Sequence, residues 1–103
     1  MAFPSNWRSP ITAPPGQFQA NVDPLSLLPS RKDLLQGRLD IQRGLLNAGI
    51  ERYTPIEVTV DGVIWDGHHA VRAAAEQNVA VTVLVVNQQV NPSASSIMHL
   101  PVG

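Results

Sequence analysis

Two adjacent histidines, His68 and His69, follow an Asp66-Gly67 pair and precede the alanine-rich stretch AVRAAAEQ. Because that stretch lacks Gly and Pro, a helix is predicted from residue 68 to about 77, with Asp66 as its N-cap. The amides and the partial positive charge of a helix N-terminus favour a bound anion. The two imidazoles could contact a phosphate or act as an acid/base pair. Alternatively, they are polar first-turn residues without chemistry.

Other catalytic and metal-binding patterns are weak in this sequence. Adjacent histidines diverge on a helix, His99 belongs to the C-terminal tail, and Asp66 is expected to be a cap, so no metal site is predicted. The chain has no cysteine, and neither a G-x-S-x-G nor a P-loop pattern occurs. Arg72 and Glu76, one turn apart on the predicted helix, are expected to form a surface ion pair.

The elements around the histidines predict a hairpin that leads into the helix. Residues 56–60 alternate apolar and polar side chains, which indicates a half-buried strand. Asp61-Gly62 predicts a two-residue turn, because both central positions of such a turn need a positive φ, and residues 63–65 return as the second strand. Asn78 is expected to end the helix. The apolar run 79–86 then predicts a central strand, reached by a right-handed parallel crossover.

A first helix is predicted over residues 31–48, with Ser30 as its N-cap and Gly49 as its stop. Arg38 and Gln42 fall between two apolar clusters on the helical wheel, so they either lie along the edge of the core or point into a cleft. Residues 22–28 are predicted to form an edge strand. The clustered apolar side chains of the helix are Leu34, Ile41, Leu45 and Ala48, with Leu35, Leu39 and Leu46 beside them.

Length and composition set the domain organisation. The 103 residues allow one domain over 21–87, preceded by a flexible arm over 1–20 and followed by an extension over 88–103 with a short strand at 97–100. Trp7 and Phe18 could attach the arm to the domain or to another subunit. The net charge of -1 provides no basic field for nucleic acid. No segment is apolar and long enough to span a bilayer or to serve as a signal peptide, so a cytoplasmic protein is expected.

The order of these elements and motifs resembles the ParB/sulfiredoxin superfamily over residues 22–86. The branch with a D-G-H-H-R type signature is matched at residues 66–69, and Ala70 stands where its arginine belongs. Sulfiredoxin activity requires a cysteine at the position of His68, so that chemistry is excluded. The resemblance is carried by Gly49, Pro55-Ile56, Asp66-Gly67-His68-His69, Arg72-Ala73-Ala74 and the strand 79–86.

The resemblance implies a small α+β domain of the ParB/sulfiredoxin type, with a mixed β-sheet and two main helices. It also implies a nucleotide, ATP or CTP with Mg²⁺, whose phosphates bind at the start of the second helix. A phosphotransferase or nucleotide hydrolase would use His68 and His69 as catalytic residues. The nucleotide- or phosphate-binding residues would be Asp66, Gly67, His68, His69, Arg72, Pro55 and Arg38.

Two alternatives to this function stay open. One is a ParB-like nuclease or nucleic-acid-binding module, and the other is a non-catalytic protein-interaction module with a decayed pocket. A homodimer through the terminal arms is expected, and a membrane partner is not.

Two variants follow from the predicted helix start. Gly67→Val is expected to abolish phosphate binding and to destabilise the fold by about 1–3 kcal/mol if Gly67 has a positive φ. His69→Ala is expected to weaken nucleotide binding and to leave stability nearly unchanged, because a polar first-turn side chain adds little to a core.

Overall fold

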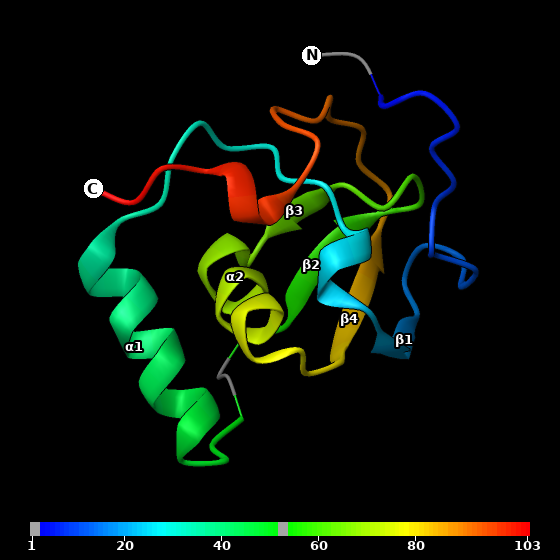
Figure 1. Ribbon diagram of the computed structural model, residues 1–103. Coiled ribbons are helices and arrows are strands. Elements are labelled where there is room, and N and C mark those ends of the chain that lie inside the picture. Colours follow the sequence, from blue (N-terminus) through cyan, green and yellow to red (C-terminus); the bar gives the residue numbers. More distant parts are fainter. Residues whose placement is uncertain (1–2, 52–53) are drawn as a thin grey trace.

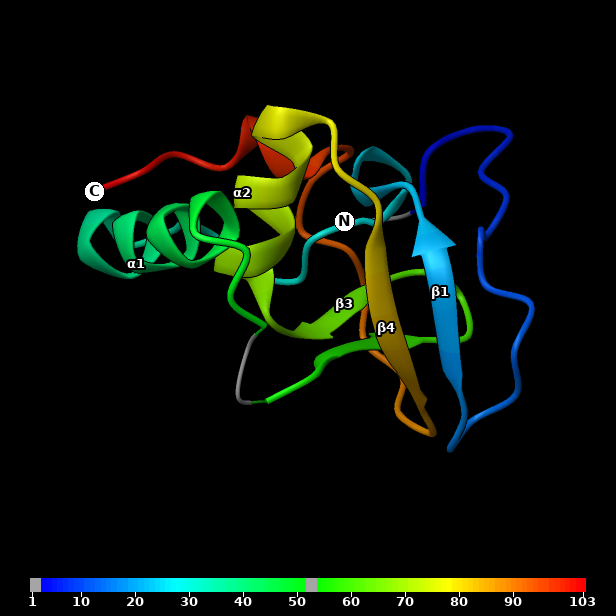
Figure 2. The same cartoon turned by 90° about the horizontal axis from the view of Figure 1, so that it is seen from below.

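The computed structural model describes residues 3–51 and 54–103, which form a four-stranded mixed sheet and two helices (Figures 1 and 2). The strand order is β1-β4-β2-β3. Helix α2 packs on the sheet, and helix α1 packs mainly against α2. This arrangement confirms the prediction of a small α+β domain with a mixed sheet. The bounds are β1 Phe18–Val22, α1 Gln36–Asn47, β2 Ile56–Thr59, β3 Ile64–Asp66, α2 His68–Gln77 and β4 Val81–Val86.

Strand β4 is central, as its apolar run predicts. It pairs antiparallel with β1 and parallel with β2. The predicted parallel crossover is wrong, because α2 connects β4 to β3, and β3 is antiparallel to β2 and therefore to β4. The inward-facing Val83 and Val85 are fully buried. The strand begins at Val81 instead of residue 79, because Asn78 ends α2 with a φ of 55° and the Val79 N–H still bonds to the Ala74 carbonyl of that helix.

The β2–β3 hairpin is present, but its turn differs from the prediction. Thr59 N–H bonds to the Val63 carbonyl, and Gly62 N–H bonds to the Thr59 carbonyl, so the loop has three residues, 60–62. Of Asp61 and Gly62, only Gly62 has a positive φ, at 81°. A three-residue loop needs one left-handed residue at its end, whereas the predicted two-residue turn needs two. Val60 therefore lies in the turn and is exposed.

Helix α2 spans His68–Gln77 as predicted, but its N-cap lies one residue later than predicted. Strand β3 continues through Asp66, which pairs with Glu57 of β2. Asp66 is thus not the N-cap. Gly67 takes that position with a φ of 102°, and no side chain caps the helix. The condition set for the Gly67→Val variant, a positive φ, is met.

Helix α1 starts at Gln36, so the prediction of a helix from residue 31 with Ser30 as N-cap is wrong. The Ser30 hydroxyl instead donates to the Ile64 carbonyl over 2.6 Å. Residues 30–35 bond to distant parts of the chain: Leu34 N–H, for example, donates to the Pro101 carbonyl over 2.9 Å. Of the residues of α1, all of which are described, only Leu39 is buried. Ile41, expected on the apolar face, is 62% exposed.

The N-terminal segment contributes to the domain. The sheet begins at Phe18, inside the predicted arm, and residues 24–26 form a short 3-10 helix, so the predicted strand 22–28 is wrong beyond Val22. The Trp7 indole N–H donates to the Asp61 carbonyl over 3.0 Å, and the Ser9 hydroxyl donates to the Val60 carbonyl over 2.7 Å. Residues before β1 therefore contact the hairpin turn of their own domain.

The C-terminal segment also packs on the domain. Residues Ile97–His99 form a 3-10 helix, not the expected strand. Ile97 and Leu100 are buried in the core with side chains from the inner face of the sheet and from α2. Among the described residues, neither helix is both long and apolar enough to cross a bilayer.

Candidate functional site

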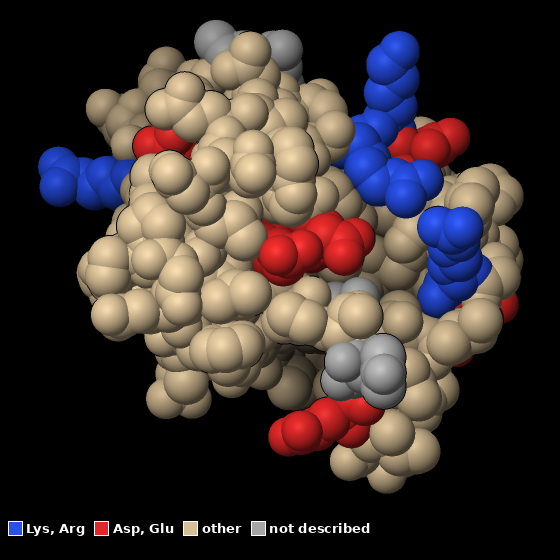
Figure 3. Space-filling model, turned by 180° about the vertical axis from the view of Figure 1, so that it is seen from behind, with Lys and Arg blue, Asp and Glu red and all other residues tan. Residues whose placement is uncertain are grey.

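A polar pocket of about 230 Å³ lies between α1 and the start of α2. Its walls come from α1, from the β3–α2 junction and from the segment before α1. On the face shown in Figure 3, most Lys and Arg atoms gather on the side of α1, and a group of Asp and Glu atoms lies nearer the middle. The lining residues are Arg31, Arg38, Ile41, Gln42, Asp66, Gly67, His68, His69 and Ala70.

The start of α2 gives this pocket its backbone donors. The helical hydrogen-bond ladder begins with Val71 N–H to the Gly67 carbonyl, so the amides of the first turn precede it. Gly67 holds the left-handed conformation that turns the chain from β3 into the helix. The partial positive charge of the helix N-terminus therefore faces a pocket that two arginines also line.

His68 is buried at 4% exposure and bonds to the segment before α1. Its Nε2 lies 2.9 Å from Ser30 N and accepts that N–H; because the Ser30 hydroxyl hydrogen goes to Ile64, the ring proton is on Nδ1. Burial, and then the charges of Arg31 and His69, lower the pKa of His68 to about 4. The ring is therefore neutral near pH 7.

His69 is buried in the same way, at 8% exposure. Its Nε2 accepts the Leu35 N–H over 3.0 Å. Both imidazoles are first-turn side chains that hold the backbone of residues 30–35. The expectation that His69→Ala leaves stability nearly unchanged is therefore replaced, because the variant removes an acceptor from a backbone amide.

Two arginines bring positive charge to the pocket from different segments. Arg38 is on the first turn of α1 and is exposed, which favours the cleft orientation for this side chain. Arg31 lies in the segment before α1, where its Nε donates to the Asp33 carbonyl over 3.2 Å. Sequence reasoning placed Arg31 in a helix and did not include it in the site. No local pattern distinguishes it, because its position depends on bonds between its neighbours and distant residues: Ser30 bonds to His68, and Pro29 bonds to Ser93.

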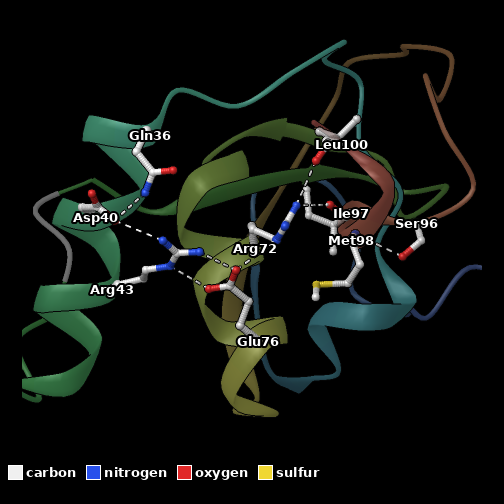
Figure 4. Close-up of polar contacts among 9 residues, drawn as sticks. All are labelled: Gln36, Asp40, Arg43, Arg72, Glu76, Ser96, Ile97, Met98 and Leu100. Carbon is white, nitrogen blue, oxygen red and sulfur yellow. Dashed lines mark hydrogen bonds and ion pairs between the residues drawn. The ribbon is translucent and has the colours of Figure 1, made fainter. Parts of the chain in front are cut away.

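Arg72 and Pro55, both predicted to bind phosphate, lie outside the polar pocket. Arg72 points away from it and donates to Glu76, the Ile97 carbonyl and the Leu100 carbonyl (Figure 4). Pro55 is exposed and lines a separate cavity of about 500 Å³ with Phe18 and Thr82. The structure brings together the other predicted site residues: Asp66, Gly67, His68, His69 and Arg38.

A second, apolar cavity of about 300 Å³ adjoins the polar pocket, and Gln42 and Ala70 line both. Its walls are chiefly aliphatic side chains of α1 and α2, such as Leu45 and Ala74. Together the two cavities form a groove between the helices that is charged at one end and apolar at the other.

Neither a metal-binding cluster among the described residues nor a related protein identifies the ligand of this site. Within residues 3–51 and 54–103, no three His, Cys, Asp or Glu side chains gather closely enough to hold a metal ion. No protein-family model, no curated protein and no solved structure matches the chain. The resemblance to the ParB/sulfiredoxin superfamily therefore rests on the sequence motifs alone.

Proposed function

We propose that the polar pocket binds the phosphate groups of a small molecule. A nucleotide such as ATP or CTP, accompanied by Mg²⁺, is the ligand that the ParB/sulfiredoxin resemblance implies. The observation that carries this proposal is the meeting of Arg31, Arg38 and the first turn of α2 around one cavity. Backbone amides at a helix start and guanidinium groups are the donors that phosphate oxygens prefer.

Each residue has a distinct part in this proposal. Gly67 keeps the backbone accessible, because it has no side chain at the point where the phosphate approaches. Arg31 and Arg38 neutralise the ligand charge from two sides. His68 and His69 fix the segment that carries Arg31, and a neutral Nδ1–H of His68 is a donor and not a base near pH 7.

Catalysis would require a proton acceptor beside the phosphate. Of the described residues that line the polar pocket, Asp66 alone carries a carboxylate. In a phosphotransferase or a nucleotide hydrolase, Asp66 is the group in position to orient an attacking hydroxyl or water. We therefore propose phosphate binding as the function of this pocket. We assign any phosphoryl-transfer or hydrolysis step to Asp66 rather than to the histidines.

A non-catalytic interaction module is the second candidate, and exposed aromatic side chains favour it. Phe18 on edge strand β1 is 63% exposed, and Trp65 on edge strand β3 is 43% exposed. Exposed aromatic side chains are common at protein interfaces. Phe18 also directly follows the N-terminal segment through which a homodimer is expected. A nucleic-acid function has no comparable support, because the net charge is -1.

Calorimetric titration with ATP, CTP and GTP, with and without Mg²⁺, tests the proposal. Wild type is expected to bind at least one of them, and Arg38→Gln is expected to bind it about tenfold more weakly with an unchanged melting temperature, because Arg38 is exposed. Absence of binding to all three would favour the interaction module. Retention of a plain DNA fragment at low salt would favour the nucleic-acid alternative instead.

A further inference from the structure

An ion-pair cluster joins the two helices on the side away from the polar pocket. Arg43 of α1 binds Glu76 of α2 with two parallel bonds, Nε to Oε1 over 2.8 Å and Nη2 to Oε2 over 2.7 Å (Figure 4). Asp40 accepts from Arg43 over 3.0 Å, and Arg72 Nε donates to Glu76 over 3.2 Å. We call these four side chains, Asp40, Arg43, Arg72 and Glu76, the clasp. The hydrogen bonds from Arg43 lower the pKa of Glu76, which keeps it ionised.

Beyond the clasp, α1 is held to the domain by hydrogen bonds from Gln77 of α2 to Asn47, over 2.7 Å, and from the Gln36 N–H to the Gly103 carbonyl, over 2.9 Å. Leu39 is its one buried residue, and the polar pocket and the apolar cavity lie between α1 and α2 where a core would otherwise be. Apolar burial therefore contributes less to the position of α1 than is usual for a helix of this length. The two-bond Arg43–Glu76 pair has the geometry of the stronger kind of ion pair. The clasp, together with the Gln77–Asn47 hydrogen bond, thus joins the two helices on this side.

Arg72 extends the same cluster to the C-terminal segment, residues 93–103, which we call the strap. Its Nη1 donates to the Ile97 carbonyl over 3.3 Å and to the Leu100 carbonyl over 3.1 Å, and its side chain is 13% exposed. Figure 4 shows the Arg72 guanidinium between Glu76 on one side and these carbonyls on the other. Arg72 therefore couples the strap to the helix pair.

The strap in turn fixes residues 29–35, the segment before α1. Leu34 N–H donates to the Pro101 carbonyl over 2.9 Å, and Ser93 N–H donates to the Pro29 carbonyl over 2.8 Å. The Ser93 hydroxyl also donates to the Arg31 carbonyl. Arg31, one cationic wall of the pocket, is thus held by the strap, and Arg38, the other, is held by the clasp through α1.

We propose that Arg72 and Glu76 are positioning residues for the polar pocket: without lining it, they set the separation of its two arginine walls. This inference rests on the proposed function, phosphate binding in that pocket. It gives Arg72 a role through the strap and the clasp, in place of the direct phosphate contact that the sequence suggested.

The test compares full-length variants that do not touch the pocket, with inorganic pyrophosphate as the probe. Glu76→Gln and Arg72→Met are each expected to weaken pyrophosphate binding about tenfold. Arg72→Lys is expected to recover much of the affinity, because an ammonium can still donate to the Leu100 carbonyl. The matched control is Asp61→Asn, which removes one carboxylate charge from the hairpin turn and is expected to bind like wild type.

A second measurement keeps the positioning role separate from phosphate binding. The histidine ring signals of each variant are titrated by NMR without ligand, since His68 is buried beneath residues 30–35. If the clasp and strap hold that segment in place, the titration midpoint of His68 rises by about one unit or more in Glu76→Gln and Arg72→Met. It is expected to stay unchanged in Asp61→Asn.

The two results separate the two proposals. If wild type fails to bind pyrophosphate or nucleotide while His68 titrates higher in both variants, the proposed function fails and the positioning role stands. If wild type binds and both variants bind like Asp61→Asn, or if both variants leave the His68 titration at its wild-type value, Arg72 and Glu76 do not position the pocket.

Discussion

Replacement of His68 by glutamine tests whether a buried neutral imidazole makes this fold sensitive to acid. Burial, together with the nearby Arg31 and His69, lowers the pKa of His68 from 6.5 to about 4. The unfolded chain binds a proton at this ring near pH 6.5, and the folded chain binds it only near pH 4. The stability that depends on the neutral ring is therefore complete above pH 6.5 and is lost as the pH falls toward 4.

The linkage relation gives the size of this loss. For the two pKa values above, the free energy of unfolding falls by about 2.5 kcal/mol between about pH 7.5 and about pH 4.5 from this group alone. Glutamine provides a carbonyl oxygen that can accept the Ser30 N–H, and it does not titrate. His68→Gln is therefore expected to lack this part of the acid sensitivity, while all other groups contribute equally to both proteins.

Urea unfolding of both proteins across this pH range measures the effect. The stability advantage of wild type over His68→Gln is expected to shrink by about 2.5 kcal/mol from the upper to the lower pH. Parallel stability curves for the two proteins would refute the reasoning, since they would mean that His68 titrates equally in the folded and unfolded chains.

Four other variants test the structure around the pocket and the hairpin. Gly67→Val should lower the free energy of unfolding by about 1–3 kcal/mol and abolish phosphate binding, because a φ of 102° strains any residue with a side chain. Thermal melting and calorimetric titration check the two effects. Gly62→Ala should lower the free energy of unfolding in urea by about 2 kcal/mol, since the φ of Gly62 is 81° and a β-carbon there would lie 2.8 Å from the Pro10 ring. An unchanged urea midpoint would contradict this prediction. His69→Ala should lose about 1–3 kcal/mol, because Leu35 N–H loses its acceptor, whereas His69→Gln should retain part of that stability.

Local patterns predicted the elements that side-chain periodicity and turn residues define. The alternation at 56–59 and the apolar run ending at Val86 are strands, and Asn78 ends α2. The turn at Asp61-Gly62 was located correctly, but its length was wrong by one residue. The N-cap was misplaced by one residue for a similar reason, because β3 pairing extends through Asp66.

The errors in the first helix and the terminal segments have a non-local cause. Residues 31–35 have helical propensity, but the Leu34 N–H bonds to the Pro101 carbonyl and the Leu35 N–H bonds to His69, and these bonds replace those of a helix. The Pro-rich N-terminal residues look like a loose arm in composition, and the Trp7 indole attaches them to the hairpin turn, one of the two attachments considered for Trp7. Arg72 was assigned to the pocket because it lies one turn after His68, whereas its guanidinium is taken by strap carbonyls that a sequence pattern does not reveal.

An amide NMR titration of wild type with ATP and with inorganic pyrophosphate tests the central claim most directly. If the polar pocket binds phosphate, both ligands should cause saturable shifts at the amides of residues 67–70 and at the side chains of Arg31 and Arg38. The Arg38→Gln variant, which lacks the Arg38 side-chain signal, should show the remaining shifts at about tenfold higher ligand concentration. Saturable shifts confined to another surface, or no shifts at the start of α2, would contradict the claim.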